Sequence, residues 1–536
     1  MSMIYDVLVI GSGGAGLSAA LEAKKYSSNI AVISKTHPTS SQTCQAQGGI
    51  NAVLNSSQDS VDSHIQDTIK AGNNLQNNKA IEIMCENASK TIKWLDELGV
   101  PFSRDINNNI SQRNFGGASY PRTCYSSDYT GLKILNTLYD SCIKEDVTFI
   151  NEHYLISFIK DDNTNTIVGI NTIDLLSGKL LQFFAKSIIV ASGGYAGIYN
   201  DYTTNSTATT GETLTHALNI GCELENMEFV QFHPTTLKES KILISESTRG
   251  EGGYLVDQNG KRFVDELKTR DEVARAIYKK IEEGNQVFLD LRHINQDTIK
   301  KNMPQEYQII QQFTGLKLDT DLIEITPSAH YTMGGIKVDI EGKTNIKNLF
   351  ACGESASNRV HGANRLGGNS LLEIITFGRI IGKNASLNAN NITYFDTCKY
   401  SNNYYSTQSQ ITEVFNLPNT INYQDIKREL GRKLFEKVGL FRDDKSLHSL
   451  LKDIKVWKQN ISKMGITDKS EVYNTDLKEF LEFKSILELA HTIILSALSR
   501  CESRGAHYRT DYLEKRRSFQ TSTIIKKENN KIEVTL

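Results

Sequence analysis

The chain has 536 residues, 39% of them hydrophobic, and a formal net charge of -2 at pH 7. This length predicts several domains, and the near-neutral charge argues against binding to nucleic acid or to an anionic membrane surface. Eight cysteines are scattered without a C-x-x-C pair, so we expect reduced thiols and no metal or iron–sulfur site held by this chain alone.

No apolar run approaches the ~20 residues of a membrane-spanning helix. The first predicted strand begins near residue 5, which leaves no room for a secretory leader. We therefore expect a cytoplasmic protein, one that could still dock peripherally on the cytoplasmic face of the membrane.

A strand, a glycine turn and a helix open the chain. Residues 6–10 are an apolar run typical of a buried parallel strand, and residues 17–24 look like a helix with Ala and Leu on one face. Gly11, Gly13 and Gly16 lie between them in the G-x-G-x-x-G spacing of a dinucleotide-binding turn. The helix N-terminus would offer free N–H groups to a pyrophosphate.

The next strand, residues 29–34, ends at Ser34 and Lys35. An NAD-dependent dehydrogenase usually carries Asp or Glu there to hold the ribose, so this end lowers the case for NAD. In the polar loop that follows, Gly48 and Gly49 allow the close backbone approach that a buried flavin ring needs.

Further elements alternate along the chain. A second buried strand, residues 187–194, stops at a glycine pair and is expected to end near the cofactor. Amphipathic helices are predicted for residues 62–72 and 78–98, strands for 147–160 and 167–175, and a helix for 211–217.

Changes in composition predict an α/β fold with five segments. A Rossmann-like dinucleotide-binding domain is interrupted by an inserted α+β capping domain for the substrate, and a helical domain follows. The expected segments are residues 1–226 (first part of the dinucleotide domain), 227–345 (capping domain), 346–395 (second part), 402–500 (helical domain) and 501–536 (C-terminal tail).

Four polar clusters carry the candidate chemistry: QFHPT at 231–235, SESTRGEGG at 245–253, HYTMGG at 330–335 and HGANRLGGNS at 361–370. A single histidine in such a cluster is more often structural. Three of them, together with Arg270 and Arg365, favour a cationic pocket for a small dianion, because arginine binds a carboxylate with two parallel hydrogen bonds and Ser245 can add another.

Two acidic residues, Glu246 and Glu354, each have two possible roles. Glu246 lies three residues before Arg249, so a helix would make them a plain ion pair, whereas a water-excluded site would let them relay a proton. Glu354 follows a predicted strand end, where it is either a ribose partner or a surface acid in a turn.

These residues resemble a known family, the flavoprotein subunits of fumarate reductase and succinate dehydrogenase, with L-aspartate oxidase as a close relative. The likeness runs from about residue 5 to residue 512 and includes QGGINA, EFVQFHPT, RGEGG, HYTMGG and HGANRLGGNSLLE. It implies FAD rather than NAD, and fumarate or succinate as the dicarboxylate substrate. It also implies a separate iron–sulfur subunit, with room for a quinone-reactive membrane anchor.

Carried over residue by residue, the resemblance implies three sets of site residues. Arg270 would protonate one alkene carbon of fumarate while reduced flavin N5 gives hydride to the other, and Glu246 with Arg249 would resupply the proton. The dicarboxylate would contact Phe115, His233, Ser245, Glu246, His330 and Arg365. FAD would be held by Gly11, Gly13, Gly14, Ala15, Gly16, Ser34, Lys35, Thr43, Gln47, Gly48, Gly49, Glu212, Glu354, Ser370 and Leu371, with Glu212 standing where the family usually has Asp.

One departure from the family concerns the flavin link. Membrane-bound members carry a histidine in S-H-T that is covalently joined to FAD, whereas this chain has Gln42 between Ser41 and Thr43. Because an amide cannot form that link, we expect non-covalent FAD. The covalent bond helps succinate oxidation, so its absence favours fumarate reduction.

A second departure concerns the substrate. L-aspartate oxidases also lack the linking histidine, but they carry Glu where this chain has Phe115. An apolar ring cannot compensate a buried ammonium, which favours fumarate over aspartate. A third reading is a flavin-holding assembly subunit without turnover, and the complete set His233, Arg270, His330 and Arg365 argues against it.

Overall fold

The computed structural model describes residues 4–392 and 396–536. A seven-stranded sheet with the strand order β6-β2-β1-β9-β8-β7 forms the centre, and one further strand, β16, also pairs with β9. β6, β2, β1, β9 and β16 run parallel, whereas β7, β8 and β9 pair antiparallel. The strands are β1 (Ile4–Ile10), β2 (Ile30–Ile33), β6 (Thr148–Ile150), β7 (His153–Asp161), β8 (Thr166–Asp174), β9 (Leu180–Val190) and β16 (Leu349–Ala351).

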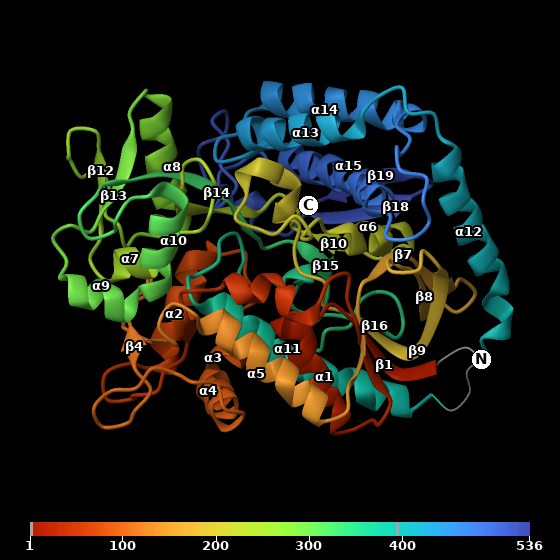
Figure 1. The fold of residues 1–536 in the computed structure, drawn as a ribbon, viewed down its shortest axis with the longest axis horizontal. Helices are drawn as coiled ribbons and strands as arrows, with labels where there is room; N and C mark the ends of the chain where they lie inside the picture. The colour runs from red at the N-terminus through yellow and green to blue at the C-terminus, as the bar shows by residue number, and fades with distance from the viewer. Residues whose placement is uncertain (1–3, 393–395) are drawn as a thin grey trace.

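Two helices pack tightly beside this sheet. α1 (Gly14–Lys24) and α11 (Asn369–Asn390) run next to each other, with α5 (Thr130–Lys144) alongside (Figure 1). They approach closely because α11 carries glycine at the contact: a Cβ on Gly382 would lie 2.1 Å from the Ala19 carbonyl oxygen. The sequence GLSAALEA therefore gives α1 a small-residue surface that α11 can cover.

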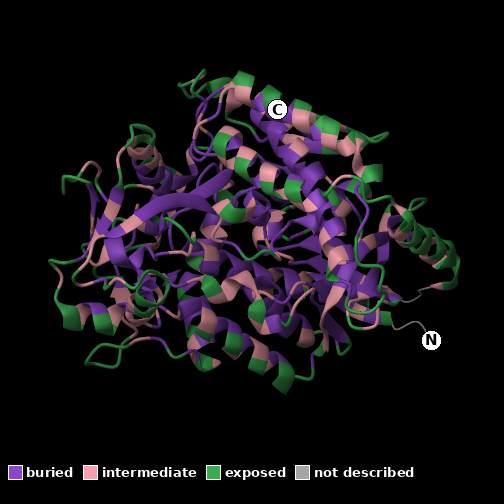
Figure 2. Cartoon of the chain, turned by 45° about the horizontal axis from the view of Figure 1, so that its top comes forward, coloured by how far each residue is buried: buried purple, intermediate pink, exposed green. Residues whose placement is uncertain are grey.

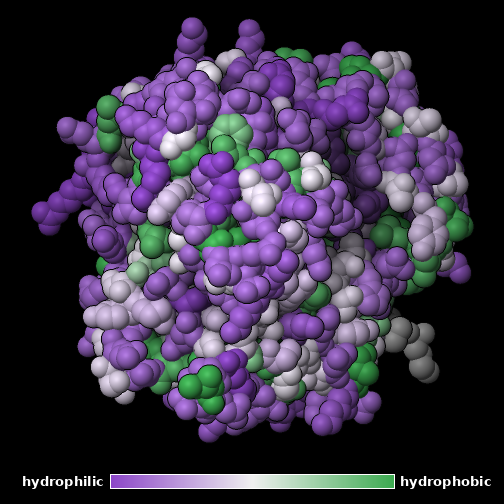
Figure 3. All heavy atoms as spheres, turned by 60° about the vertical axis from the view of Figure 1, so that its left-hand side comes forward, coloured by the Kyte–Doolittle hydropathy of each residue, from purple (hydrophilic) through white to green (hydrophobic). Residues whose placement is uncertain are grey.

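A second unit, the capping region, sits at the left of Figure 1. Its four-stranded sheet has the order β11-β14-β13-β12 and surrounds a separate apolar core. The face over this region is mostly hydrophilic, with hydrophobic side chains only in small scattered areas (Figure 3). Its elements are β11 (Val230–Leu237), α7 (Ser247–Gly250), β12 (Tyr254–Asp257), α8 (Arg270–Glu282), β13 (Val287–Asp290), α9 (Gln296–Asn302), α10 (Pro304–Thr314) and β14 (Ile323–Thr332).

Helices cover the upper side of the molecule in Figure 1. α15 is the buried member, and α13 and α14 carry alternating buried and exposed stripes above it (Figure 2). Within the described residues, no helix combines the length and apolar character needed to cross a membrane. The helices of the upper side are α13 (Tyr423–Val438), α14 (Asp444–Gln459) and α15 (Thr475–Ser499), and α12 (Ser401–Asn416) runs down the right side of Figure 1.

The remaining elements join these units. A five-stranded sheet brings the C-terminal hairpin β18–β19 against β10. It contains β10 (Leu224–Glu225), β15 (Gly335–Lys337), β17 (Ala356–Ser357), β18 (Ile524–Glu528) and β19 (Lys531–Thr535). The other short elements are β3 (Ile50–Asn51), α2 (Val61–Gly72), α3 (Asn78–Glu86), α4 (Ala88–Glu97), β4 (Gln112–Arg113), β5 (Thr123–Cys124) and α6 (Glu212–Asn219).

The predicted α/β class with a helical C-terminal region is confirmed, while two expected elements were wrong in detail. Residues 78–98 form two helices that meet at Asn87. Residues 147–160 form two strands because Glu152, at φ 58°, turns the chain between β6 and β7. β6 pairs parallel with β2, whereas β7 pairs antiparallel with β8. The bounds of the five predicted segments stay a prediction.

Candidate active site

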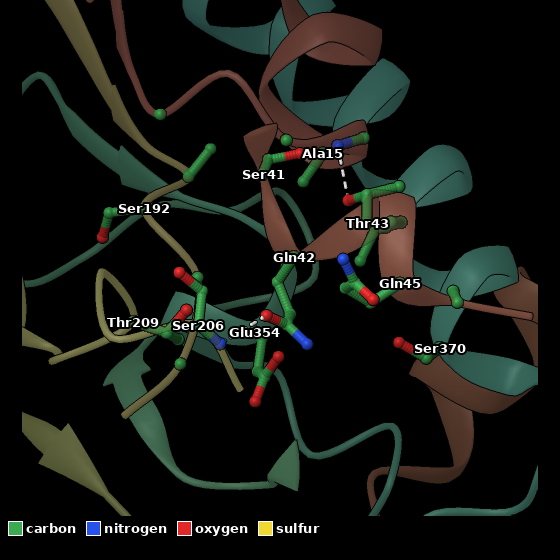
Figure 4. Close-up of a pocket in the computed structure, with 18 of the residues that line it drawn as sticks. Ala15, Ser41, Gln42, Thr43, Gln45, Ser192, Ser206, Thr209, Glu354 and Ser370 are labelled. Carbon is green, nitrogen blue, oxygen red and sulfur yellow. Dashed lines mark hydrogen bonds between the residues drawn. The ribbon is translucent and has the colours of Figure 1, made fainter. Parts of the chain in front are cut away.

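The glycine turn between β1 and α1 has the expected construction. Gly11 adopts φ +110°, and a Cβ there would lie 2.2 Å from the Ala191 carbonyl oxygen. A Cβ on Gly16 would lie 1.9 Å from the Gly11 carbonyl oxygen, so Gly16 serves the strand–helix contact. The N-cap residue of α1 is Gly13, which has no side chain to cap the helix. The Gly14 N–H donates instead to Thr43 Oγ1 at 3.0 Å (Figure 4). The helix therefore directs N–H groups toward the space that a pyrophosphate would occupy.

One cavity gathers almost all predicted site residues. Gly16 and Arg249 are the exceptions: the first lies behind the turn and the second behind Glu246. The predicted residues that line the cavity are Gly11, Gly13, Gly14, Ala15, Ser34, Lys35, Thr43, Gln47, Gly48, Gly49, Phe115, Glu212, His233, Ser245, Glu246, Arg270, His330, Glu354, Arg365, Ser370 and Leu371.

Several polar atoms at the glycine-rich end are left open to a ligand. Within the described part of the chain, Ser41 Oγ, Ser192 Oγ and Gln47 Oε1 are buried and have no hydrogen-bond partner. Such atoms are costly to bury unless a ligand or ordered water satisfies them. Together with the glycine turn they fit a dinucleotide with hydroxyl and phosphate groups.

A lysine connects the far end of this cavity to the helical region. Lys35 Nζ lies 2.7 Å from both Glu212 Oε1 and Glu482 Oε1. Glu212 begins α6 and Glu482 lies on α15, so three distant segments meet at one charge. Glu212 reaches the cavity, but its carboxylate is engaged by Lys35.

Glu354 and Gln42 extend into the same space (Figure 4). Glu354 Oε1 accepts hydrogen bonds from the Thr332 N–H at 2.9 Å and from the Thr332 hydroxyl at 3.1 Å. Burial raises the pKa of Glu354 to about 7. The Gln42 side chain accepts from the Ser206 N–H at 2.9 Å and donates to the Thr204 carbonyl.

Two histidines enter the other end from neighbouring strands. His233 lies on β11 and His330 on β14, and their ring centroids are 5.0 Å apart. His330 Nδ1 lies 2.8 Å from Thr204 Oγ1. Burial, followed by the charge of Arg270, holds the pKa of both rings well below its usual value. The histidines therefore offer hydrogen bonds to a ligand, and the positive charge of this part of the cavity comes from its arginines.

Two arginines supply that charge and share one acceptor. Gln231 Oε1 accepts from Arg365 Nη2 at 3.1 Å and from Arg270 Nη1 at 3.3 Å. Arg365 is 4% exposed, lies 4.1 Å from the centre of the Tyr331 ring, and its Nε has no partner among the described residues. Burial and repulsion by Arg270 lower the pKa of Arg365 to about 9. Donors left unsatisfied on a buried cation favour an anionic ligand.

A buried carboxylate lies behind Arg270. Arg270 Nε donates to Glu246 Oε2 at 2.7 Å, and the Gly116 N–H donates to Glu246 Oε1 at 3.0 Å. Arg249 Nη2 lies 3.8 Å from Glu246 Oε1 on the short helix α7. Burial raises the pKa of Glu246, but Arg270 and Arg249 outweigh it and bring the pKa below its usual value. Glu246 is thus a carboxylate held between two guanidinium groups.

Two family models match this chain. The model described as an FAD binding domain matches residues 6–371, and the model described as fumarate reductase flavoprotein C-term matches residues 427–536. The 8-methylmenaquinol:fumarate reductase flavoprotein subunit of Wolinella succinogenes is 36% identical over 95% of this chain and 86% of its own. The chain belongs to the fumarate reductase/succinate dehydrogenase flavoprotein family.

Other relatives agree with this assignment. The succinate dehydrogenase flavoprotein subunit of Rickettsia felis is 36% identical over 95% of this chain and 90% of its own. A solved structure of a mutant E. coli quinol fumarate reductase superposes with a TM-score of 0.95 at 32% identity, covering 100% of this chain and 97% of the other. The cofactor of this family member is FAD.

Sequence reasoning missed three residues of this flavoprotein's site. Gln231 was inside a recognised cluster but had no role, Tyr331 stacks on Arg365, and Glu306 accepts the Ser245 N–H at 2.7 Å. Gln231 and Tyr331 both stand in recognised clusters, close to His233 and His330, so their neighbours could have pointed to them, whereas no local signal marks Glu306. His361, the third clustered histidine, is buried against Tyr331 and does not line the cavity.

Proposed function

We propose that this chain interconverts fumarate and succinate as the catalytic flavoprotein subunit of a fumarate reductase or succinate dehydrogenase complex. As a member of this family it is an FAD-dependent oxidoreductase acting on a CH–CH group. The observation that carries the proposal is the convergence of Arg270 and Arg365 on Gln231, in the cavity that also contains the glycine turn. When bound, FAD supplies the hydride for the alkene.

Residues on both sides of the glycine turn would hold FAD. Gly13 lines the cavity as the N-cap residue of α1, so it would lie beside the pyrophosphate, next to the free N–H groups of the first helical turn. Ser370 and Leu371 lie in the first turn of α11, where N–H groups remain free for a ligand oxygen. Lys35 and Glu354 would contact the cofactor from the opposite walls.

The dicarboxylate would be clamped at its two ends. Arg365 would bind one carboxylate through the donors that the protein leaves open, and His330 would add a hydrogen bond. His233 and Ser245 line the other side, and Phe115 is a 3% exposed ring packed against Gly48 and Gly367. Holding both ends aligns the alkene and excludes water, and such positioning provides a large part of a rate enhancement.

The proton would come from Arg270. A guanidinium holds its proton tightly, so Arg270 can donate only if the proton is replaced at once. Glu246, 2.6 Å from Arg270 Nη2, is placed to replace it, and Arg249 behind it extends the relay. This line of three charged groups supports a catalytic subunit over a flavin-holding assembly subunit.

The direction follows from Gln42. Its amide contacts Ser206 and Thr204, and an amide cannot form the covalent flavin link, so FAD would be non-covalent and fumarate reduction favoured. The test is acid precipitation of the yellow holoprotein. We expect a colourless pellet and a yellow supernatant; a yellow pellet would overturn this part of the proposal.

Electrons would reach the flavin through other chains. The relatives named as quinol or menaquinol fumarate reductases point to quinol as the electron source. We infer a separate iron–sulfur subunit and a membrane anchor, which would place this chain at the cytoplasmic membrane face. Co-purification of an iron-containing protein from native membranes would support this, and a fully active isolated chain with quinol would contradict it.

The main experiment compares two assays on the purified, FAD-loaded chain. Reduced viologen with fumarate tests the proposal, and L-aspartate with oxygen tests the alternative aspartate oxidase. We expect viologen oxidation with fumarate and no hydrogen peroxide from aspartate, since Phe115 offers no charge to an ammonium group. Peroxide from aspartate without fumarate turnover would replace the proposal, and inactivity in both assays would favour the assembly role.

A further inference from the structure

A second cavity, of about 460 Å³, lies where the flavin-binding core meets the helical region. β7 and α6 form one wall, and α12, α15 and the end of α14 form the other. Apolar side chains make up much of the lining, including Ile156, Phe158, Ile411 and Leu487. Its size lies within the range of about 300–1,000 Å³ that is typical of small-molecule sites.

The charged side chains of this cavity are unbalanced. Lys458, Lys484 and Lys527 face a single carboxylate, that of Glu488. Glu488 pairs with Lys458 and, at 2.8 Å, with Lys527. Lys484 is exposed and has no ion pair or hydrogen bond among the described residues, and the carboxylate whose charge acts on it is that of Glu413 on α12. The lining therefore carries more positive than negative charge, and Lys484 has no carboxylate in direct contact within the described residues.

A histidine adds a polar atom to the same space. His216 lines the cavity from α6, and its Nε2 is buried without a hydrogen-bond partner in the described part of the chain. Burial lowers the pKa of His216 to about 4, so the ring is neutral at pH 7. An unpartnered ring nitrogen in a cavity lined by lysines is the kind of group that a ligand satisfies.

We propose that this second cavity binds a small dianion with an apolar body. Nucleoside monophosphates and aryl dicarboxylates share this chemistry. The apolar wall would take the body, and Lys484 with the Lys458–Lys527 pair would take the charge. His216 would hydrogen-bond an oxygen of the ligand.

A ligand bound in this second cavity would affect the binding of FAD in the first. Tyr154 lines it, and Lys35, which lines the flavin cavity, lies 5.9 Å from the centre of the Tyr154 ring. Lys35 is held by Glu212, four residues before His216 on α6, and by Glu482, two residues before Lys484 on α15.

A ligand that contacts both His216 and Lys484 would thus order the two helices that fix Lys35. We expect it to tighten FAD binding, because the ligand and FAD favour the same arrangement. This inference requires the FAD site of the family but not the proposed fumarate chemistry.

The binding test uses the FAD-loaded full chain, titrated calorimetrically with AMP, phthalate, inorganic phosphate and adenosine. We expect AMP or phthalate to bind, and phosphate and adenosine to bind at least tenfold more weakly, because each lacks either the body or the charge. The AMP and phthalate arms distinguish the two ligand sources. Using FAD-loaded protein keeps AMP out of the flavin cavity.

Variants separate this site from the first. Lys484→Gln should weaken binding at least tenfold, whereas Lys452→Gln, an exposed lysine on α14 outside the cavity, should not change it. Arg365→Gln should leave binding intact, because that residue belongs to the other cavity. Absence of binding, or equal binding by Lys484→Gln, would overturn the proposal.

The coupling test follows the release of FAD by its fluorescence after dilution. With saturating ligand we expect release to slow at least threefold in the unmodified chain and to be unaffected in Lys484→Gln. If the ligand binds but leaves the rate of FAD release unchanged, the coupling between the two cavities is overturned. Fumarate turnover would be unaffected by that result. A chain that binds and couples but does not reduce fumarate would contradict only the proposed function.

Discussion

The chain buries arginine in two places, and the two places treat it differently. In the C-terminal arginine cluster (Arg500, Arg504 and Arg509), Arg500 is 0% exposed and pairs with Glu228 at 2.6 Å and Glu502 at 3.1 Å, with backbone carbonyls taking its remaining donors. In the candidate active site, Arg365 has only the Gln231 side-chain oxygen, and its Nε is left open within the described residues.

This difference separates structural arginine from binding arginine. A buried cation whose donors are all occupied connects segments of the chain, as Arg500 connects α15 to the tail. A buried cation with free donors awaits a partner, since uncompensated burial of charge is costly. Residue type is the same in both regions, so the pattern of partners distinguishes their roles.

The largest expected effect concerns Arg270. Arg270→Gln should lower fumarate reduction by about 10³–10⁴-fold, because it removes the proton donor, while FAD content stays unchanged. Reduced-viologen kinetics measure the rate. Arg292→Gln, an exposed arginine of the capping region, is the control and should retain at least half of the activity. Retained activity in Arg270→Gln would remove this residue from the chemistry.

The next largest effect is on stability and concerns the C-terminal arginine cluster. Arg500→Gln should lower the free energy of unfolding by about 3–5 kcal/mol, because it leaves Glu228 and Glu502 buried without their shared cation. Urea denaturation of the purified chain measures this. Arg365→Gln should change the same quantity by less than about 1 kcal/mol, since no carboxylate loses its partner. Equal losses in the two variants would abolish the distinction between the regions.

Substrate binding should show the reverse order. Arg365→Gln should raise the KM for fumarate by about 10–100-fold, the loss expected when hydrogen bonds to a charged group are removed. Steady-state kinetics over a wide fumarate range give this value. A KM within threefold of the unmodified chain would mean that Arg365 does not contact the substrate.

The smallest effect is a difference in pH dependence. Burial raises the pKa of Glu354 from 4.5 to about 7, so its contribution to the stability of FAD-free protein is full below pH 4.5 and is lost as pH rises through 7. Hydrogen bonding to Arg509 lowers the pKa of Asp511, so its contribution is present above its ordinary value of 3.8 and is lost as pH falls below that.

Thermal melts at pH 5 and pH 8 test the first half. Between pH 5 and pH 8 the free energy of unfolding of the FAD-free chain should fall by about 1–3 kcal/mol as Glu354 ionises. Glu354→Gln should remove this loss, and Asp511→Asn should leave it in place. A melting temperature of Glu354→Gln that falls as steeply as that of the unmodified chain would show that another group carries the dependence.

Local signals were enough to predict the glycine turn of the candidate site, whereas the FAD roles of the other residues stay predictions. The spacing of Gly11, Gly13 and Gly16 directly reflects one turn between a strand and a helix, so neighbouring residues were enough. The family resemblance named His233, His330 and Arg365, which the fold brings into one cavity.

Long-range contacts were beyond the sequence. Lys35 and Glu482 are 447 positions apart and form one ion pair, and no local pattern marks that meeting. The lowered pKa of His233 and His330 could not be predicted from the sequence either, because it depends on burial beside Arg270. The break at Asn87 also escaped, since 78–98 has helical periodicity throughout.

The most direct test of the central claim is a titration of the FAD-loaded chain with succinate, followed by the change in flavin absorbance. A cavity with an open arginine for an acid group should give saturable binding, at least 100-fold tighter than that of butyrate, which has one carboxylate. Arg365→Gln should abolish this preference. Equal affinity for succinate and butyrate, or tighter binding of L-aspartate than of succinate, would contradict the account.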